Sequence, residues 1–159
     1  MDYIYTFFVD PKERIIQHKK ISQKDWYEEM RADIGCRLIE TQAVIDAPAT
    51  RWWGDEEGLL KSDEERYFFK FSTLQNIDNG IRVYDHSKAT KDYIKNFDSF
   101  WTPPIVWEFC GPCFFTGVTE TEEGEDLASV QLPLWQFAQC IEFMHEGYQV
   151  EPSIEFISI

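Results

Sequence analysis

Short stretches in which apolar and polar residues alternate, separated by turn residues, make up most of the chain. Residues 3–9 are rich in aromatic and β-branched side chains, which favour strands. Asp10-Pro11-Lys12-Glu13 has the composition of a turn, so we expect residues 14–18 to return as the second strand of a hairpin. The same reasoning predicts a second hairpin over 51–61 and further strands at 36–44, 66–71, 81–84, 105–109, 114–119, 127–130 and 154–159.

A first helix is predicted shortly after the opening hairpin. Ser22 followed by Asp25 resembles a capping box, with Asp in the place where Glu is usual. The next apolar residues recur every four positions, which places them on one face of a helix: Trp26, Met30 and Ile34. Gly35 is expected to end this helix, because glycine readily adopts the left-handed conformation found after a last helical turn.

Two further helices are predicted. Ser87 would begin a short one that runs to Phe97. Pro133 suits the first position of the other, which would end at Gly147 and whose apolar stripe is Leu134, Phe137, Ala138, Ile141 and Met144. With about three helices and strands mostly in hairpins, we predict an α+β fold: a mostly antiparallel, hairpin-rich sheet with helices packed on it, in a single domain over 1–159.

Negative charge dominates the composition. The chain has 29 Asp and Glu against 15 Lys and Arg, which gives a net charge of −14. Residues 96–159 contain eleven Asp and Glu and no Lys or Arg. Direct binding of nucleic acid is disfavoured, because it uses clustered Lys and Arg, whereas a basic protein partner is compatible with this charge. The expected protein-binding face is the acidic turn formed by Glu120, Glu122, Glu123, Glu125 and Asp126. A solvated surface that keeps the protein in solution is the alternative interpretation.

The sequence gives no support for membrane insertion or secretion. No apolar run reaches the roughly 18 residues that a membrane helix needs, and residues 1–5 lack the basic region of a secretory signal. We therefore expect a cytoplasmic protein, in the host cytoplasm if a phage encodes it. In that compartment the four cysteines are expected to be reduced thiols: Cys36, Cys110, Cys113 and Cys140.

Two cysteines separated by Gly-Pro, Cys110 and Cys113, have two chemical interpretations. Thiol redox chemistry would need a helix to follow and lower the pKa of the first thiol, but residues 114–119 predict a strand. A zinc site would need Cys140 and His145 as further ligands, and residues five apart on a helix lie about 140° apart around it. No cofactor and no catalytic residue are predicted; a catalytic site that assembles only in three dimensions stays open.

Adjacent aromatic residues suggest a different kind of site. Neighbours on a strand point to opposite faces, so one of Trp52 and Trp53 would lie in the core and the other would be exposed or covered by a helix. A pocket that joined such rings to Arg51, Arg66 and Arg82 could stack on a nucleobase and pair with its phosphate. The alternative function is therefore a small-molecule binder that sequesters a nucleotide-like ligand.

Three segments carry a resemblance to a known family. They are Ile34-Gly35-Cys36 with the strand 38–40, the acidic turn over 55–61, and the glycine-bounded strand over 111–117. Together with the opening hairpin, they resemble a family of small phage and mobile-element proteins known as domain of unknown function 3846, over about half of the chain. The resemblance implies a phage or mobile-element origin and no particular activity.

These observations favour a non-enzymatic binding protein over the small-molecule binder and over thiol or zinc chemistry. We expect its acidic face to engage the nucleic-acid groove of a basic host protein, as a nucleic-acid mimic that inhibits a defence or replication protein. We expect this protein to bind neither nucleic acid directly nor a membrane. The sequence leaves its oligomeric state open.

Overall fold

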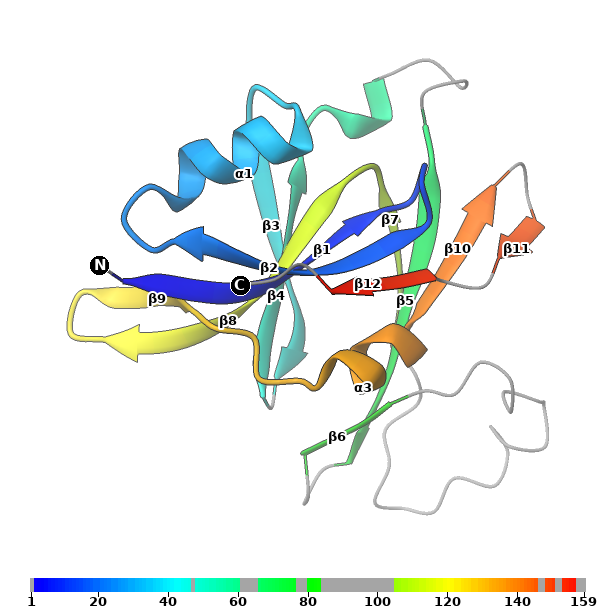
Figure 1. The fold of residues 1–159 in the computed structure, drawn as a ribbon. Coiled ribbons are helices and arrows are strands. Elements are labelled where there is room, and N and C mark those ends of the chain that lie inside the picture. Colours follow the sequence, from blue (N-terminus) through cyan, green and yellow to red (C-terminus); the bar gives the residue numbers. More distant parts are fainter. Residues whose placement is uncertain are drawn as a thin grey trace.

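The fold consists mainly of two β-sheets, in which every described pair of strands is antiparallel except β12 with β2, which is parallel (Figure 1). The computed structural model describes residues 2–46, 48–60, 66–76, 80–83, 105–145, 148–150 and 153–156. Sheet A has the order β12 (Ser153–Phe156), β2 (Ile15–Ser22), β1 (Tyr3–Asp10), β8 (Cys113–Thr121), β4 (Ala49–Asp55), β3 (Ile39–Asp46), and β9 (Gly124–Ala128) also pairs with β8. Sheet B has the order β11 (Tyr148–Val150), β10 (Ile141–His145), β5 (Phe68–Asn76), β6 (Gly80–Val83), and β7 (Ile105–Cys110) also pairs with β5.

The predicted α+β class is wrong, because the described residues are mostly β with only two short α-helices. The first helix, α1 (Trp26–Ile34), agrees with the prediction: Met30 and Ile34 are buried, and Gly35 ends it with φ 74°. Its N-cap is Asp25 rather than Ser22, although the Asp25 N–H donates to the Ser22 hydroxyl oxygen at 3.2 Å. The helix expected over 87–97 lies outside the described residues.

The last predicted helix is correct only in its first half. Helix α3 (Leu134–Gln139) stops after six residues, and the next segment is strand β10. Ile141 and Met144 therefore lie in sheet B, where β10 pairs with β5 and Ile141 stands opposite Phe71. Cross-strand pairing and burial outweigh the helical spacing of these apolar residues, as tertiary context commonly does.

The opening hairpin is confirmed, and the second predicted hairpin is wrong. Strands β1 and β2 pair over their full length, and the Asp10 carboxylate accepts the Lys12 N–H at 3.1 Å in the turn. Strand β4 pairs instead with β3 on one side and β8 on the other. The residues after it form the 3-10 turn η1 (Gly58–Leu60), not a returning strand.

The strands of sheet A bury side chains on both faces. One cluster, between the two sheets, contains Trp52 and Phe115; the other, under α1, contains Met30 and Phe114. Trp53 packs at the edge of the second cluster, with its ring centroid 5.1 Å from that of Trp26. Adjacent aromatic residues thus pack into two different clusters, as the alternation of side chains along a strand predicts.

Helix length and polarity also bear on membrane insertion. Among the helices that the structure describes, none combines the length and the apolar character that crossing a membrane would require.

Gly54 is predicted to be required for the packing of Trp52. A Cβ atom at Gly54 would overlap Cζ2 of the Trp52 ring, which is buried between the sheets. Overpacking a core costs about 1–3 kcal/mol, so Gly54→Ala should lower the free energy of unfolding by that amount in urea denaturation. Gly58→Ala is the matched control, because its Cβ would lie 3.5 Å from the Cys110 carbonyl oxygen, an ordinary contact. Equal stability of the two variants would contradict this account of the packing.

Candidate functional site

The expected acidic turn forms the tip of the β8–β9 hairpin. Glu120, Glu122, Glu123, Glu125 and Asp126 are all exposed, and we call these five residues the acidic hairpin. The chain reverses between strands β8 and β9, helped by a φ of 118° at Gly124. The Thr121 hydroxyl donates to the Gly124 carbonyl oxygen at 2.8 Å and its oxygen accepts the Glu123 N–H at 3.3 Å, so this side chain bridges the turn.

Like charges face each other across this hairpin. Glu120 stands opposite Glu125 in the ladder between β8 and β9. Like charges directly opposite on neighbouring strands repel and are destabilising. A bound cation would relieve that repulsion, so the arrangement favours the approach of a basic group.

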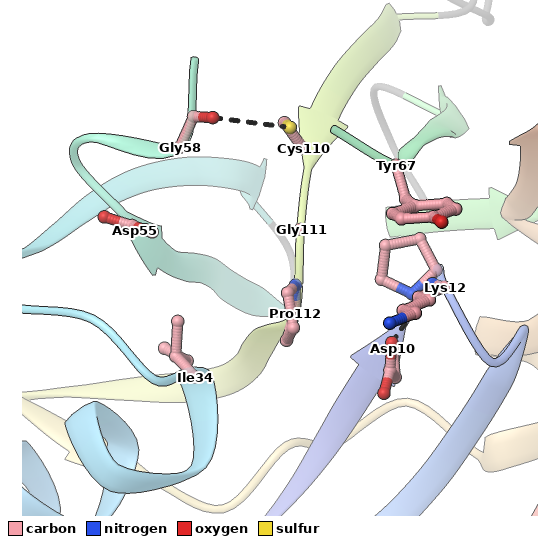
Figure 2. A pocket seen from close by; sticks show the side chains of 10 residues that line it. Asp10, Lys12, Ile34, Asp55, Gly58, Tyr67, Cys110, Gly111 and Pro112 are labelled. Atoms are coloured by element: carbon pink, nitrogen blue, oxygen red, sulfur yellow. Dashed lines mark hydrogen bonds between the residues drawn. The ribbon is translucent and has the colours of Figure 1, made fainter. Parts of the chain in front are cut away.

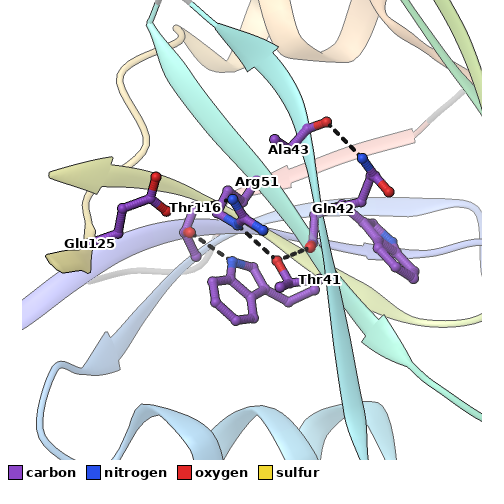
Figure 3. Close-up of polar contacts among 8 residues, drawn as sticks. Thr41, Gln42, Ala43, Arg51, Thr116 and Glu125 are labelled. Atoms are coloured by element: carbon purple, nitrogen blue, oxygen red, sulfur yellow. Dashed lines mark hydrogen bonds and ion pairs between the residues drawn. The ribbon is translucent and has the colours of Figure 1, made fainter. Parts of the chain in front are cut away.

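One described cation reaches the acidic hairpin from strand β4. A terminal guanidinium nitrogen of Arg51 lies 3.6 Å from the Glu125 carboxylate (Figure 3). The Arg51 Nε–H donates to the Thr41 hydroxyl oxygen at 3.1 Å, and the Thr41 hydroxyl donates to the Trp52 carbonyl oxygen at 2.8 Å. Arg51 thereby links one side of the acidic hairpin to the adjacent strands β3 and β4.

The structure separates most of the residues expected in an aromatic ligand pocket. Arg51 and Trp53 lie together, with the guanidinium carbon 5.9 Å from the ring centroid. Trp52 points to the other face of the sheet, where it stacks on Phe109 at 4.3 Å between centroids. Arg66 is half-buried just before β5, and the side chain of Arg82, in β6, lies outside the described part of the chain.

The Trp53 side chain is held by contacts with sheet A and helix α1. Its indole N–H donates to the Thr116 hydroxyl oxygen at 2.8 Å (Figure 3). The Trp26 ring lies edge-on to it at 5.1 Å between centroids. These contacts fix Trp53 between helix α1 and sheet A, where it acts as a packing residue.

The four cysteines are thiols in different environments. Cys113 and Cys140 are fully buried between the sheets; burial raises the pKa of the Cys113 thiol well above its ordinary value and that of Cys140 to about 12. Cys113 begins strand β8, so no helix N-terminus stabilises its thiolate. Cys110 is half-buried, and its thiol donates to the Gly58 carbonyl oxygen at 3.8 Å.

The zinc ligands considered from the sequence do not form a group in the described part of the structure. No cluster of three or more His, Cys, Asp or Glu side chains there is arranged to hold a metal ion. Cys110 ends β7, whereas Cys140 lies between α3 and β10. The side chain of His145, the last residue of β10, lies outside the described residues.

A cavity of about 240 Å³ adjoins the turn between Cys110 and Cys113 (Figure 2). Its lining includes Cys110, Asp55 and Tyr67, together with Lys12 from the β1–β2 turn. Cys113 is not part of this lining, since its side chain is buried in the core. The two thiols therefore face different surroundings, one a cavity and the other the packed interior.

Sequence reasoning found the acidic hairpin but missed its link to Arg51. Arg51 and Glu125 are 74 positions apart, and no local pattern connects them. The link exists because β4 and β9 both pair with β8 on opposite sides, which places the two side chains near each other. Only the order of strands in sheet A carries that information.

Comparison with known proteins gives no relative for this chain. No protein-family model, no curated protein and no solved structure matches it. The resemblance to domain of unknown function 3846 therefore stays a prediction, and the function is argued from the geometry alone.

The cysteine environments predict selective alkylation. A thiol with a pKa near 12 is about one part in ten thousand thiolate at about pH 8, and the thiolate is the form that reacts. Iodoacetamide should modify Cys36 and Cys110 in the folded protein and should leave Cys113 and Cys140 unmodified until denaturant is added. Peptide mass spectrometry measures the four sites separately. Modification of Cys113 in the folded protein at the rate of Cys110 would contradict its assignment as a core residue.

Proposed function

We propose that this protein is a non-enzymatic acidic protein of phage or mobile-element origin that binds a basic, nucleic-acid-binding host protein and inhibits it. The observation that carries the proposal is the acidic hairpin, five exposed carboxylates at the tip of one β-hairpin. Among the described residues, Arg51 alone forms an ion pair with one of them. The remaining carboxylates are available to a partner, and their negative charge is complementary to clustered Lys and Arg.

The shape of the acidic hairpin supports the same role. Its strands are held by the ladder between β8 and β9 and its tip by the Thr121 hydroxyl. A hairpin backbone that is already ordered before binding loses less conformational entropy on binding, which favours affinity. A dense local negative charge also accelerates association with a positively charged groove. A nucleic-acid-binding groove is such a surface, because it is built to hold phosphates.

Charge reversal at the tip tests this proposal. Glu122→Lys/Glu123→Lys changes the net charge by four units and leaves the Arg51–Glu125 ion pair in place. The variant should bind its partner about tenfold more weakly, equivalent to about 1.4 kcal/mol. The measurement is affinity capture from bacterial lysate at low salt, with quantification of the proteins that a DNA duplex elutes. A partner that uses its nucleic-acid groove is released by DNA, because the two ligands compete for one site.

The matched control reverses two exposed glutamates elsewhere, Glu13→Lys/Glu28→Lys, with the same change in net charge. Glu28 also pairs with Arg31, but exposed pairs on a helix contribute little. The control should retain the DNA-eluted proteins. Equal loss from both variants would show that net charge acts without a specific site, and retention by the hairpin variant would refute the assignment of the acidic hairpin.

A further inference from the structure

A second acidic surface lies between the edge strands of the two sheets. Among the described strands, β3 pairs only with β4, and β7 only with β5. Between them is a groove of about 300 Å³, here called the edge groove, whose lining includes Glu40, Gln42, Trp52, Glu56, Leu59 and Trp107. It is near the Asp55 end of β4, whereas Arg51 and the acidic hairpin are toward the other end.

Three nearly parallel aromatic rings line one side of the edge groove, and of these only Trp107 is half-buried rather than buried. The rings of Trp52 and Phe109 stack with centroids 4.3 Å apart and an interplanar angle of 10°. Trp107 extends this parallel arrangement, at 6.2 Å from Phe109 and 7°. Trp52 and Phe109 are buried, at 5% and 7% exposed, so the half-buried Trp107 offers the aromatic contact, which suits the planar guanidinium of arginine and the aliphatic stem of arginine or lysine.

Carboxylates face this aromatic side. Glu40 and Gln42 stand opposite Gly54 and Trp52 in the β3–β4 ladder, so their side chains share the face of the sheet that carries Trp52. Burial, and then the negative charges of Glu56 and Asp55, raise the pKa of Glu40. Neither Glu40 nor Glu56 forms an ion pair with any described residue. The groove thus concentrates negative charge beside an apolar surface.

The rim of the edge groove is apolar and exposed. Leu59 lines the groove and is 65% exposed, and its neighbour Leu60 is 80% exposed. Two adjacent leucines held in solvent by a short 3-10 turn offer a contact for an apolar side chain. The combination of flat aromatic rings, carboxylates and an apolar rim is complementary to a basic residue that has an apolar neighbour.

We propose that the edge groove binds an arginine or lysine side chain from a basic segment of the partner protein. The aliphatic part of that side chain lies against Trp107, the half-buried ring of the stack, and its charged group pairs with Glu40 and Glu56. A volume of about 300 Å³ is at the small end of ligand clefts, which suits one side chain better than a longer peptide. This inference rests on the proposed function, since it assumes a basic protein partner, and it gives that partner a second contact remote from the acidic hairpin.

Two short peptides test the edge groove without knowledge of the partner. One is acetyl-Gly-Arg-Leu-Gly-amide, and the other carries citrulline, a neutral isostere, in place of arginine. Binding is followed by NMR through the indole N–H signals of Trp52 and Trp107, assigned with Trp→Phe variants. The arginine peptide should shift these signals with saturation, and the citrulline peptide should bind about tenfold more weakly. No shift at about 10 mM arginine peptide, or equal binding of both peptides, would overturn the proposal.

Variants of the groove and of the acidic hairpin separate the two surfaces. Glu40→Gln/Glu56→Gln should weaken the arginine peptide about tenfold, and Leu59→Ser should weaken both peptides a few-fold. The matched controls, Glu13→Gln/Glu28→Gln and the exposed Trp135→Ser, should leave peptide binding unchanged. Equal weakening by Glu13→Gln/Glu28→Gln would show diffuse attraction and would refute the groove. One outcome would refute the groove and leave the proposed function standing. In that outcome Glu122→Lys/Glu123→Lys loses partner capture, but the arginine peptide does not bind the wild-type protein.

Discussion

The first half of strand β8 is buried on both faces, and the described layers on either side of sheet A pack against it. Phe115 and Cys113 point into the core between the sheets, while Phe114 points under helix α1. A strand with two apolar faces needs a layer on each side, which sheet B and α1 provide. Its backbone pairs with β1 on one side and with β4 on the other. Large-to-small changes of the phenylalanines at such positions cost about 3–5 kcal/mol, so the first half of β8 tolerates them poorly.

The same strand carries the candidate binding surface beyond the core. After Gly117 the side chains of β8 become exposed, and the strand continues into the acidic hairpin. A rigid, buried half therefore supports an exposed, charged half within nine residues. Strand β4 has a comparable division: Arg51 contacts the acidic hairpin near one end, and Asp55 borders the edge groove at the other. The two acidic surfaces are thus held by the strands that form the core.

Local patterns predicted part of this structure. The β1–β2 hairpin, helix α1 and the turn at Gly124 follow from turn residues, helical spacing and glycine, all of which act over a few neighbouring positions. The spacing of apolar residues over 141–144 predicts a helix, although Ile141 and Phe143 also lie two positions apart, as on one face of a strand. Gly54, which lies within the hairpin predicted over 51–61, instead makes room for the Trp52 ring. The Arg51–Glu125 pair and the edge groove depend on strand order, which no local pattern contains.

Zero-length cross-linking tests the central claim, that the acidic hairpin contacts the partner, most directly. A carbodiimide joins a carboxylate to a lysine amine only when the two groups touch, and mass spectrometry then identifies both residues. For a captured partner, the account predicts cross-links from Glu122 and Glu123 to lysines in the nucleic-acid groove of that partner. Cross-links confined to acids remote from both surfaces, such as Glu13 and Glu28, would contradict it.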